Sequence, residues 1–219
     1  MSLPAHKTAL IATSIENKIL KFGTYTLKSG RVSPYFFNAG GFNTAALLST
    51  LANAYANTIA ESSLEFDVVF GPAYKGIPLA STTATALYTL DPVRFANIGY
   101  AFNRKEAKAH GEGGTIVGAD LKGKRVLVVD DVITAGTAIR EAMGIITAAG
   151  GELAGIVIAL DRQERLVEDG DESAIQAVRR ETGVTVVPIL TLADLIEGVE
   201  GEARENMKEY RARYGAKAE

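Results

Sequence analysis

Two adjacent carboxylates, Asp130 and Asp131, follow the apolar run 126–129 in the stretch KRVLVVDDVITAGTAIREA. Residues 134–137 read TAGT and lead into a segment with a helical pattern. Free backbone N–H groups at the start of a helix favour an anion such as phosphate. The carboxylates would repel a phosphate, so we expect them to meet sugar hydroxyls or a divalent cation. The stretch therefore fits a ribose 5-phosphate; the alternative is a capped turn beside a solvated acid pair.

The elements that must position these groups alternate between short apolar strands and helices. We expect strands at 66–70, 95–102, 125–129, 153–160 and 184–190. We expect a first helix through Ile11, Ile15, Ile19 and Phe22, ended by Gly23, and a second from a cap at Asn43 to Ile59. Further helices are expected through Leu79 and Leu87, over 137–149, from a capping box at 173–176, and at the end of the chain. This alternation predicts an α/β fold, a parallel sheet with helices on both faces. Ligands bind such sheets at the carboxyl ends of the strands, which brings together the loops GPAYKG, DDVITAGTA and DRQER.

Residues 103–123, NRKEAKAHGEGGTIVGADLKG, have a different composition from the rest of the chain. Charged side chains fill the first half, and five glycines lie at positions 111, 113, 114, 118 and 123. Such a segment buries little apolar surface, so we expect a long mobile loop or an exposed ribbon.

The overall composition excludes several classes of protein. The chain has 219 residues, 47% hydrophobic and 22% charged, with no cysteine and a formal charge of −3. A globular core is expected, disulfides and thiolate metal sites are excluded, and a dedicated nucleic-acid or membrane-surface binder is disfavoured. No window approaches the ~18 apolar residues of a membrane span. We expect a soluble, cytoplasmic protein.

Two common nucleotide motifs are missing. Gly71 and Gly76 have the spacing of a P-loop, but Ile77 and Pro78 stand where that motif needs Lys and Ser or Thr. No G-x-G-x-x-G follows any expected strand, so a dinucleotide site is unsupported.

VLVVDDVITAGTA resembles the phosphoribosyl pyrophosphate (PRPP) signature of type I phosphoribosyltransferases. Four further stretches resemble the orotate phosphoribosyltransferase branch of that family: YTLKSGRVSPYFFNAG (25–40), FGPAYKGIPLA (70–80), FNRKEAKAHGEGG (102–114) and LDRQER (160–165). The resemblance covers most of the chain in order. Its small departures are Tyr25, where Phe is frequent, and Val32, where a basic residue is common.

This resemblance implies transfer of the 5-phosphoribosyl group from PRPP to orotate with Mg²⁺, giving orotidine 5′-monophosphate and pyrophosphate in pyrimidine biosynthesis. It also implies the type I fold with a small N-terminal hood, built mainly from about 1–42, and a flexible catalytic loop at about 103–123. The chain would be a single domain over 1–219, without a fused decarboxylase barrel. It would form a homodimer in which this loop reaches the neighbouring site, with no nucleic-acid or membrane partner.

The resemblance implies roles for particular residues. Catalytic roles fall on Lys105, Asp130, Asp131, Lys108 and His110. PRPP binding falls on Tyr74, Lys75, Arg104, Lys105, Lys108, His110, Asp130, Asp131, Val132, Ile133, Thr134, Ala135, Gly136, Thr137 and Ala138, and orotate binding on Lys28, Phe36, Phe37, Thr134 and Arg162. Asp130 and Asp131 would hold the metal indirectly, through PRPP and water, and a cis peptide is expected near Ala73-Tyr74.

Two other functions share these motifs. One is a PRPP-binding regulator without turnover, which is disfavoured because the basic loop is kept and no helix-turn-helix extension is visible. The other is a phosphoribosyltransferase for a purine or for uracil. It is disfavoured because Lys28, Phe36, Phe37 and Arg162 suit a carboxylated base.

Overall fold

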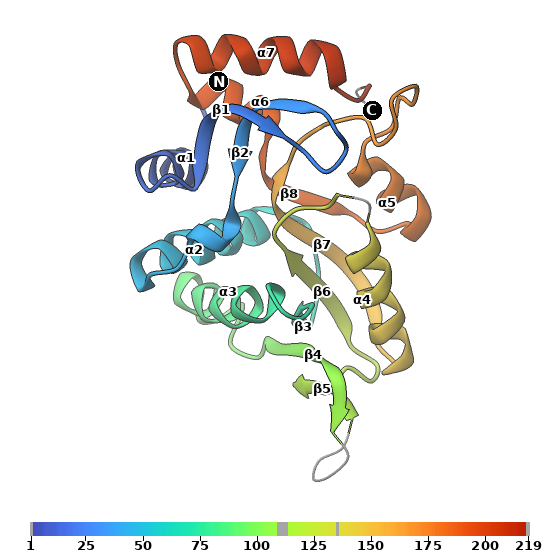
Figure 1. Ribbon diagram of the computed structural model, residues 1–219. Helices are drawn as coiled ribbons and strands as arrows, with labels where there is room; N and C mark the ends of the chain where they lie inside the picture. The colour runs from blue at the N-terminus through green and yellow to red at the C-terminus, as the bar shows by residue number, and fades with distance from the viewer. Residues whose placement is uncertain (1, 109–113, 135, 218–219) are drawn as a thin grey trace.

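The computed structural model describes residues 2–108, 114–134 and 136–217. Its helices and strands follow one another in this order: α1 Ala5–Glu16, β1 Leu20–Thr26, β2 Val32–Phe37, the short 3-10 helix η1 Ala39–Gly41, α2 Ala45–Glu61, β3 Val68–Gly71, α3 Gly76–Leu90, β4 Gly99–Lys108, β5 Gly114–Gly118, β6 Arg125–Asp130, α4 Thr137–Ala148, β7 Glu152–Asp161, α5 Ala174–Thr182, β8 Val186–Thr191, α6 Leu192–Gly198 and α7 Glu202–Tyr214. In this part of the chain six strands form one sheet, in the order β5-β4-β3-β6-β7-β8 (Figure 1). None of these helices combines the length and apolar character needed to cross a membrane.

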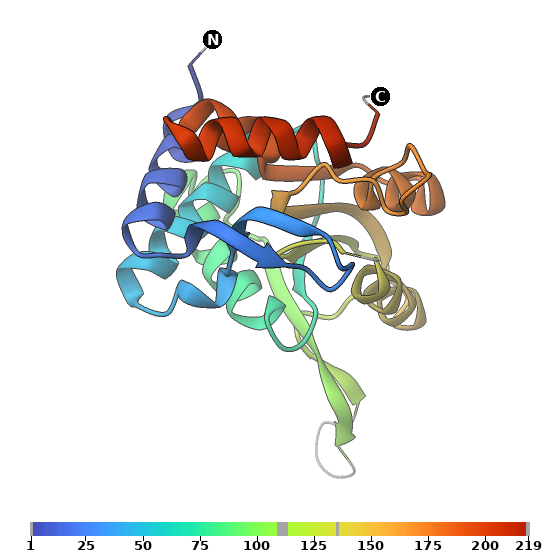
Figure 2. The same ribbon diagram turned by 45° about the horizontal axis from the view of Figure 1, so that its top comes forward.

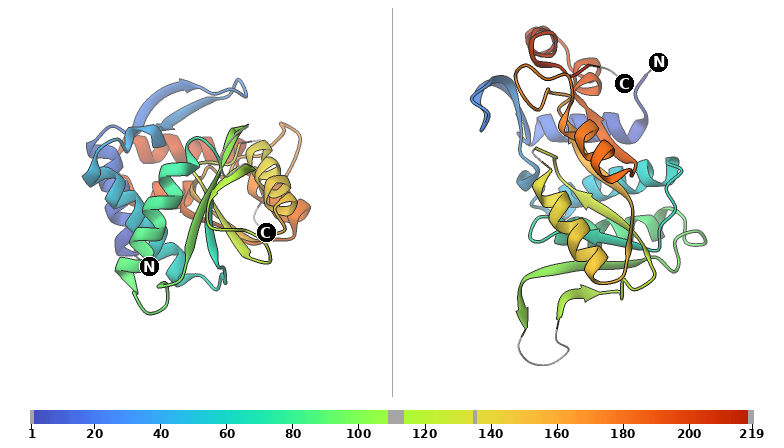
Figure 3. Two further views of the ribbon diagram at one scale, coloured as in Figure 1. Left: turned by 90° about the horizontal axis from the view of Figure 1, so that it is seen from below. Right: turned by 90° about the vertical axis from the view of Figure 1, so that its right-hand side faces the viewer.

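The main sheet is parallel apart from its edge strand β5, which runs antiparallel to β4. Helices α1, α2 and α3 lie on one side of the sheet, and α4 and α5 lie on the other (Figures 1 and 3). Because both faces are covered, the central strands are apolar throughout rather than alternating. β3, β6 and β7 are neighbours, so the loops that follow them meet at one edge of the sheet. The expected α/β class is confirmed.

Two apolar cores, one on each face of the sheet, hold the strand that carries the acid pair. In β6, Leu127 and Val129 are buried in the core beneath α2, whereas Val126 and Val128 are buried in the core beneath α4. The loop after β6 continues this division, since Val132 packs against the first core and Ile133 is buried in the second. The side chains of Val132 and Ile133 therefore anchor the loop.

A two-stranded hairpin, β1 with β2, lies outside the main sheet beside α7. Leu20 and Tyr35 of this hairpin are fully buried, and the rings of Tyr35 and Tyr210 meet edge-on with centroids 6.3 Å apart. The first and last described parts of the chain both lie at this end of the molecule (Figure 2). The C-terminal helix thus supports the N-terminal hairpin.

The expectation of a first helix running through Ile19 to Gly23 is wrong. Helix α1 ends at Glu16, Lys18 takes a left-handed conformation with φ 56°, and the chain then enters β1. The helical spacing that joins Ile19 and Phe22 to Ile11 and Ile15 is therefore coincidental. Ile19 and Phe22 pack in the core at the hairpin end of the molecule. The cap of the second helix also differs by one residue, since the hydroxyl of Thr44, not Asn43, accepts the N–H of Leu47.

The expected strand at 95–102 begins later and runs further. Phe95 lies in a turn, where its buried ring stacks on Phe66 with centroids 6.4 Å apart, and β4 begins at Gly99. β4 then continues to Lys108 and pairs with β5, so the described part of 103–123 is a ribbon, one of the two expected alternatives. It projects from the body of the molecule (Figures 1 and 2).

The later elements agree with the expectation, with shifts of one or two residues at their ends. The capping box is confirmed, since Ser173 and Gln176 exchange hydrogen bonds at the start of α5. The expected last helix is two helices, α6 and α7, because the chain breaks at Gly201 with φ 71°.

Candidate active site at the carboxyl edge of the sheet

Asp130 and Asp131 face different surroundings although they are neighbours. The Asp130 side chain is only 9% exposed, and its Oδ1 accepts the N–H of Asp131 at 2.9 Å. Burial raises the pKa of Asp130 to about 6. Asp131 accepts the N–H of Val132 at 2.9 Å through Oδ1 and the Lys75 ammonium at 2.7 Å through Oδ2. Each carboxylate is therefore held in one orientation before any ligand arrives.

The backbone beneath the acid pair is fixed as firmly as the side chains. The hydroxyl of Tyr55, a fully buried residue of α2, donates to the carbonyl of Asp130 at 2.6 Å. The carbonyl of Asp131 accepts the N–H groups of Ala159 and Leu160 at 2.9 and 3.2 Å. The sequence analysis missed Tyr55, because its helical spacing marks it only as part of an apolar face.

The turn before α4 has the geometry expected of an anion site. Gly136 is buried with φ 74°, and a Cβ there would lie 3.0 Å from a methyl carbon of Val178. Helix α4 begins at Thr137, and no side chain of the described residues caps its start. Thr134, Thr137 and Ala138 are exposed beside these N–H groups. Backbone donors and hydroxyls therefore line the turn, as a phosphate requires.

The loop between β3 and α3 brings a cation to the same edge. Its two glycines pack backbone to backbone, so that a Cβ on Gly71 would lie 1.9 Å from the carbonyl oxygen of Gly76. The expected cis peptide is confirmed at Ala73-Tyr74. Tyr74 is 71% exposed, and the ion pair with Asp131 raises the pKa of Lys75 above its ordinary value. Lys75 therefore stays charged beside the acid pair.

Asn103 links this loop to the ribbon. It is 5% exposed on β4, and its Oδ1 accepts the N–H of Ala73 at 2.9 Å. Its Nδ2 donates to the carbonyl of Arg104 at 3.3 Å. The sequence analysis quoted this asparagine inside a motif without giving it a role, because its burial and its partner Ala73 are visible only in the structure.

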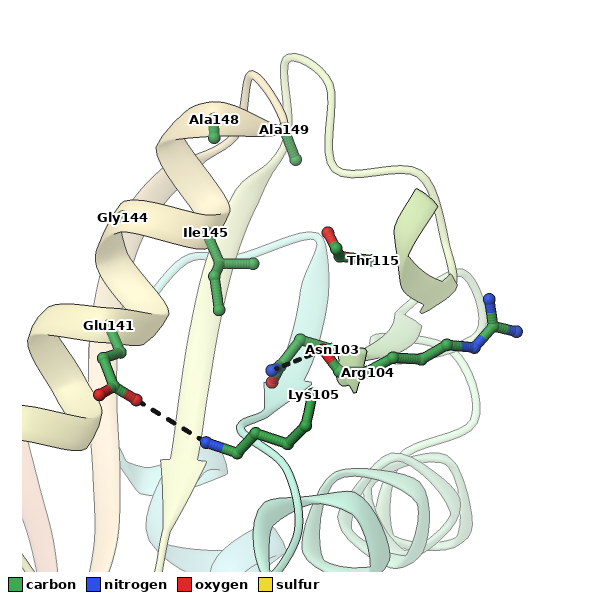
Figure 4. A pocket seen from close by; sticks show the side chains of 9 residues that line it. All are labelled: Asn103, Arg104, Lys105, Thr115, Glu141, Gly144, Ile145, Ala148 and Ala149. Carbon is green, nitrogen blue, oxygen red and sulfur yellow. Dashed lines mark hydrogen bonds and ion pairs between the residues drawn. The ribbon is translucent and has the colours of Figure 1, made fainter. Parts of the chain in front are cut away.

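The ribbon cations lie beside a groove between β4–β5 and α4 (Figure 4). The Lys105 ammonium is 3.8 Å from the Glu141 carboxylate of α4, and Arg104 points away from that helix (Figure 4). Lys108 is the last residue of β4, and nothing is described of its side chain. His110 lies outside the described residues, as does Ala135.

The residues expected to bind the base do not all share one surface. Phe36 is 40% exposed and its ring lies against Tyr25 with centroids 5.5 Å apart. The ring of Phe37 is buried and packs against Phe42, so of these two neighbours only Phe36 presents its ring at the surface. Lys28 is exposed in the turn between β1 and β2.

Arg162, the remaining cation expected to bind the base, lies in the loop after β7 at the edge of the main sheet. Its side chain is largely buried and pairs with Glu164. Burial lowers the pKa of Arg162, but the nearby Tyr35 and Glu164 more than offset this and keep the pKa above its ordinary value.

Comparison with known proteins identifies the family. A family model described as "Phosphoribosyl transferase domain" matches residues 43–190. A Neurospora crassa protein named orotate phosphoribosyltransferase is 53% identical over 229 residues, covering 98% of each chain. The chain belongs to the orotate phosphoribosyltransferase family. Among solved structures, that of the Francisella tularensis family member superposes with a TM-score of 0.83 at 41% identity, covering 94% of this chain and 98% of that one.

A more distant family member, the Mycobacterium tuberculosis orotate phosphoribosyltransferase solved in complex with PRPP, is 25% identical with a TM-score of 0.62, covering 86% of this chain and 98% of that one.

The side chains present suit a magnesium ion that a substrate brings with it. Among the described residues no group of three or more His, Asp, Glu or Cys side chains converges as a metal site. Mg²⁺ commonly keeps several waters and uses one or two carboxylates together with substrate phosphates. In this family member, Asp130 and Asp131 are two such carboxylates at the edge where a phosphate would bind, so they fit a metal held mainly by other ligands.

Proposed function

We propose that this chain transfers the 5-phosphoribosyl group from PRPP to N1 of orotate, forming orotidine 5′-monophosphate and pyrophosphate in pyrimidine biosynthesis. The observation that supports it most is the meeting of three groups at one sheet edge. The acid pair ends β6, the uncapped turn at Gly136 follows it, and Lys75 of another loop lies 2.7 Å from Asp131. The ribose diol requires acceptors such as the acid pair, the 5-phosphate requires donors such as the uncapped turn, and the pyrophosphate requires a cation such as Lys75. The relatives named above, one of them solved with PRPP, support the same reaction.

In this proposal the fixed groups hold PRPP and orient its anomeric carbon. Asp130 and Asp131 accept hydrogen bonds from the ribose hydroxyls, and the turn that begins at Thr134 and ends at Ala138 donates to the 5-phosphate through its N–H groups and hydroxyls. Tyr74 and Lys75 line the pyrophosphate. On binding, a ribose hydroxyl takes up the Asp131 oxygen that now holds Lys75, which frees that ammonium for the pyrophosphate.

The bond between the anomeric carbon and pyrophosphate breaks early, so the site must stabilise a departing polyanion. Arg104, Lys105, Lys108 and His110 supply positive charge as the ribbon closes, and closure also excludes water. Mg²⁺, when bound, would neutralise further charge on the pyrophosphate oxygens. The orotate ring would lie against Phe36 and the backbone of Phe37, with Lys28, Thr134 and Arg162 as partners for its polar groups and carboxylate.

We extend the proposal to the assembly and setting of the protein. The chain would act as one domain over 1–219, with a hood built mainly from about 1–42, and as a homodimer whose 103–123 segment serves the neighbouring site. The β4–β5 ribbon supports this, because it projects from the body of the molecule (Figure 1). We place the protein in the cytoplasm, with orotate and PRPP as its partners.

A spectrophotometric assay tests the reaction. The purified protein, PRPP and Mg²⁺ are mixed with orotate, and the loss of orotate absorbance is followed, with uracil, hypoxanthine and adenine as parallel substrates. We expect turnover of orotate alone, abolished by chelating the metal. Turnover of another base would contradict the assignment of orotate. PRPP binding without turnover of any base would favour a regulator.

A further inference from the structure

Two sides of the Arg162 guanidinium are already occupied. Nε donates to Oε1 of Glu164 at 2.7 Å, and Nη2 lies 2.6 Å from the same oxygen. Nη2 also donates to the Ser33 hydroxyl at 3.1 Å. The guanidinium carbon lies 4.6 Å from the centroid of the Tyr35 ring, which fixes the plane of the group. Among the described residues no group accepts a hydrogen bond from Nη1, although the buried Tyr210 hydroxyl lies close to the guanidinium, so Nη1 is the nitrogen left for a ligand.

Glu164 is itself held between two arginines. Its Oε2 lies 3.7 Å from Nη1 of Arg31, and that nitrogen donates to the carbonyl of Arg165 at 2.7 Å. The side chains of Arg31, Glu164 and Arg162 are 12%, 13% and 16% exposed. Three ionised groups so far from water are costly unless their geometry is tightly matched. The negative Glu164 lies between the positive Arg31 and Arg162, which provides that match. These three groups together carry one positive charge in excess.

The same contacts join the hairpin to the loop after β7. Arg31 and Ser33 belong to the hairpin end of the molecule, which also carries Phe36, whereas Arg162 and Glu164 follow β7. The Glu164 carboxylate therefore fixes where Nη1 of Arg162 lies relative to the exposed ring of Phe36.

We propose that Glu164 is a positioning residue, which orients Arg162 so that Nη1 meets the carboxylate of orotate. This inference rests on the proposed function. Neutralising Glu164 would leave two buried guanidinium groups next to each other without the charge between them. They would repel each other, and Arg162 would lose the orientation that Nε and Nη2 now impose. The loss should fall on the base substrate and not on PRPP, which binds at the other strand ends.

The test compares Glu164→Gln with Glu168→Gln, a matched change at an exposed position of the same loop. We expect Glu164→Gln to raise the KM for orotate about tenfold, as when a charge-assisted hydrogen bond is misdirected. The kcat and the KM for PRPP should stay within about twofold, and Glu168→Gln should leave all three unchanged. The melting temperature should fall in either case, because a buried charge loses its partner. A merely structural role would shift the KM values for orotate and PRPP together.

If Glu164→Gln does not fold, Glu164→Asp serves in its place, since it keeps the charge but withdraws the carboxylate; it should raise the KM for orotate in the same selective way. An orotate KM within twofold of wild type in the folded variant would overturn the inference alone. A wild-type protein without orotate turnover would overturn the proposed function, and this inference with it.

Discussion

The acid pair after β6 and the cations of the β4–β5 ribbon carry opposite charge, and the fold holds them in opposite ways. Asp130 is buried, and the carbonyls of both acids are bonded to α2 and to β7. Lys105 stands on a projecting ribbon with about half of its side chain exposed, and its partner Glu141 is 3.8 Å away and still more exposed. The acid pair is held by buried hydrogen bonds before any ligand binds, whereas Lys105 has a long and exposed ion pair.

This difference separates two tasks of a transferase. A group that must bind a sugar in one orientation gains from being fixed in advance, because little freedom is lost on binding. A group that must cover a departing pyrophosphate and then release it gains from weak resting contacts. We therefore expect changes in the fixed region to alter PRPP binding and stability, and changes in the ribbon to alter turnover.

The strongest expected effect comes from the ribbon. Lys105→Ala should lower kcat about 10²- to 10³-fold, because its charge matters most as pyrophosphate leaves. Its melting temperature should equal that of wild type. Lys122→Ala, a change of another exposed lysine near the ribbon, is the control and should keep full activity. Normal turnover by Lys105→Ala would remove this lysine from the mechanism.

Asp130→Asn should move binding and stability in opposite directions. The loss of a charged acceptor should weaken PRPP binding about 10- to 100-fold. Burial raises the pKa of Asp130 to about 6, so the folded state holds this proton more tightly than the unfolded state does. The resulting stabilisation of wild type is present below about pH 4 and is lost as the pH rises through about 6.

Well above pH 6 the variant, which cannot ionise, should therefore be more stable than wild type by on the order of 2 kcal/mol. Urea unfolding of both proteins near pH 4 and near pH 7.5 measures this difference. An equal stability gap at both pH values would contradict it.

The same pKa predicts the pH dependence of the wild-type reaction. PRPP should bind the ionised Asp130, so kcat/KM for PRPP should fall as the pH drops below about 6 and approach a tenfold loss for each further pH unit. Initial rates between pH 5 and 8 in one mixed buffer give the profile. A flat profile through this range would show that the charge of Asp130 is not needed.

Tyr55→Phe probes the support beneath the acid pair with a smaller expected effect. Removing the hydroxyl leaves the buried carbonyl of Asp130 without this donor, which should cost about 1 to 2 kcal/mol of unfolding free energy. PRPP affinity should fall with it, whereas kcat at saturation should not. Tyr88→Phe, at an exposed position of α3, is the matched control.

The smallest expected effect is at Glu141. Its pair with Lys105 is long and exposed, and such pairs contribute at most about 0.5 kcal/mol. Glu141→Gln should therefore leave stability unchanged and kcat within twofold. A loss of stability above 1 kcal/mol would show that the ribbon is fastened more firmly than its exposure indicates.

The sequence predicted the sheet, the order of its later elements and the grouping of the three loops, because buried parallel strands have unmistakable apolar runs. It failed where one pattern fits two structures, as at Ile19 and Phe22, which suit a helix or a hairpin. It also missed side chains whose role depends on distant partners. The hydroxyl of Tyr55 and the amide of Asn103 acquire a role only when α2 and β4 meet the site. Glu164 stands in the quoted stretch LDRQER, but its burial against Arg31 is visible only in the structure.

Titration of PRPP with Mg²⁺ into Lys105→Ala, followed by calorimetry, tests the division between the two regions most directly. A Kd within about threefold of wild type, in a variant whose kcat has fallen at least 100-fold, is the expected result, because the anchors for PRPP are intact. A Kd weakened as much as kcat would contradict that division, since it would mean that the ribbon holds the substrate as well as covering it.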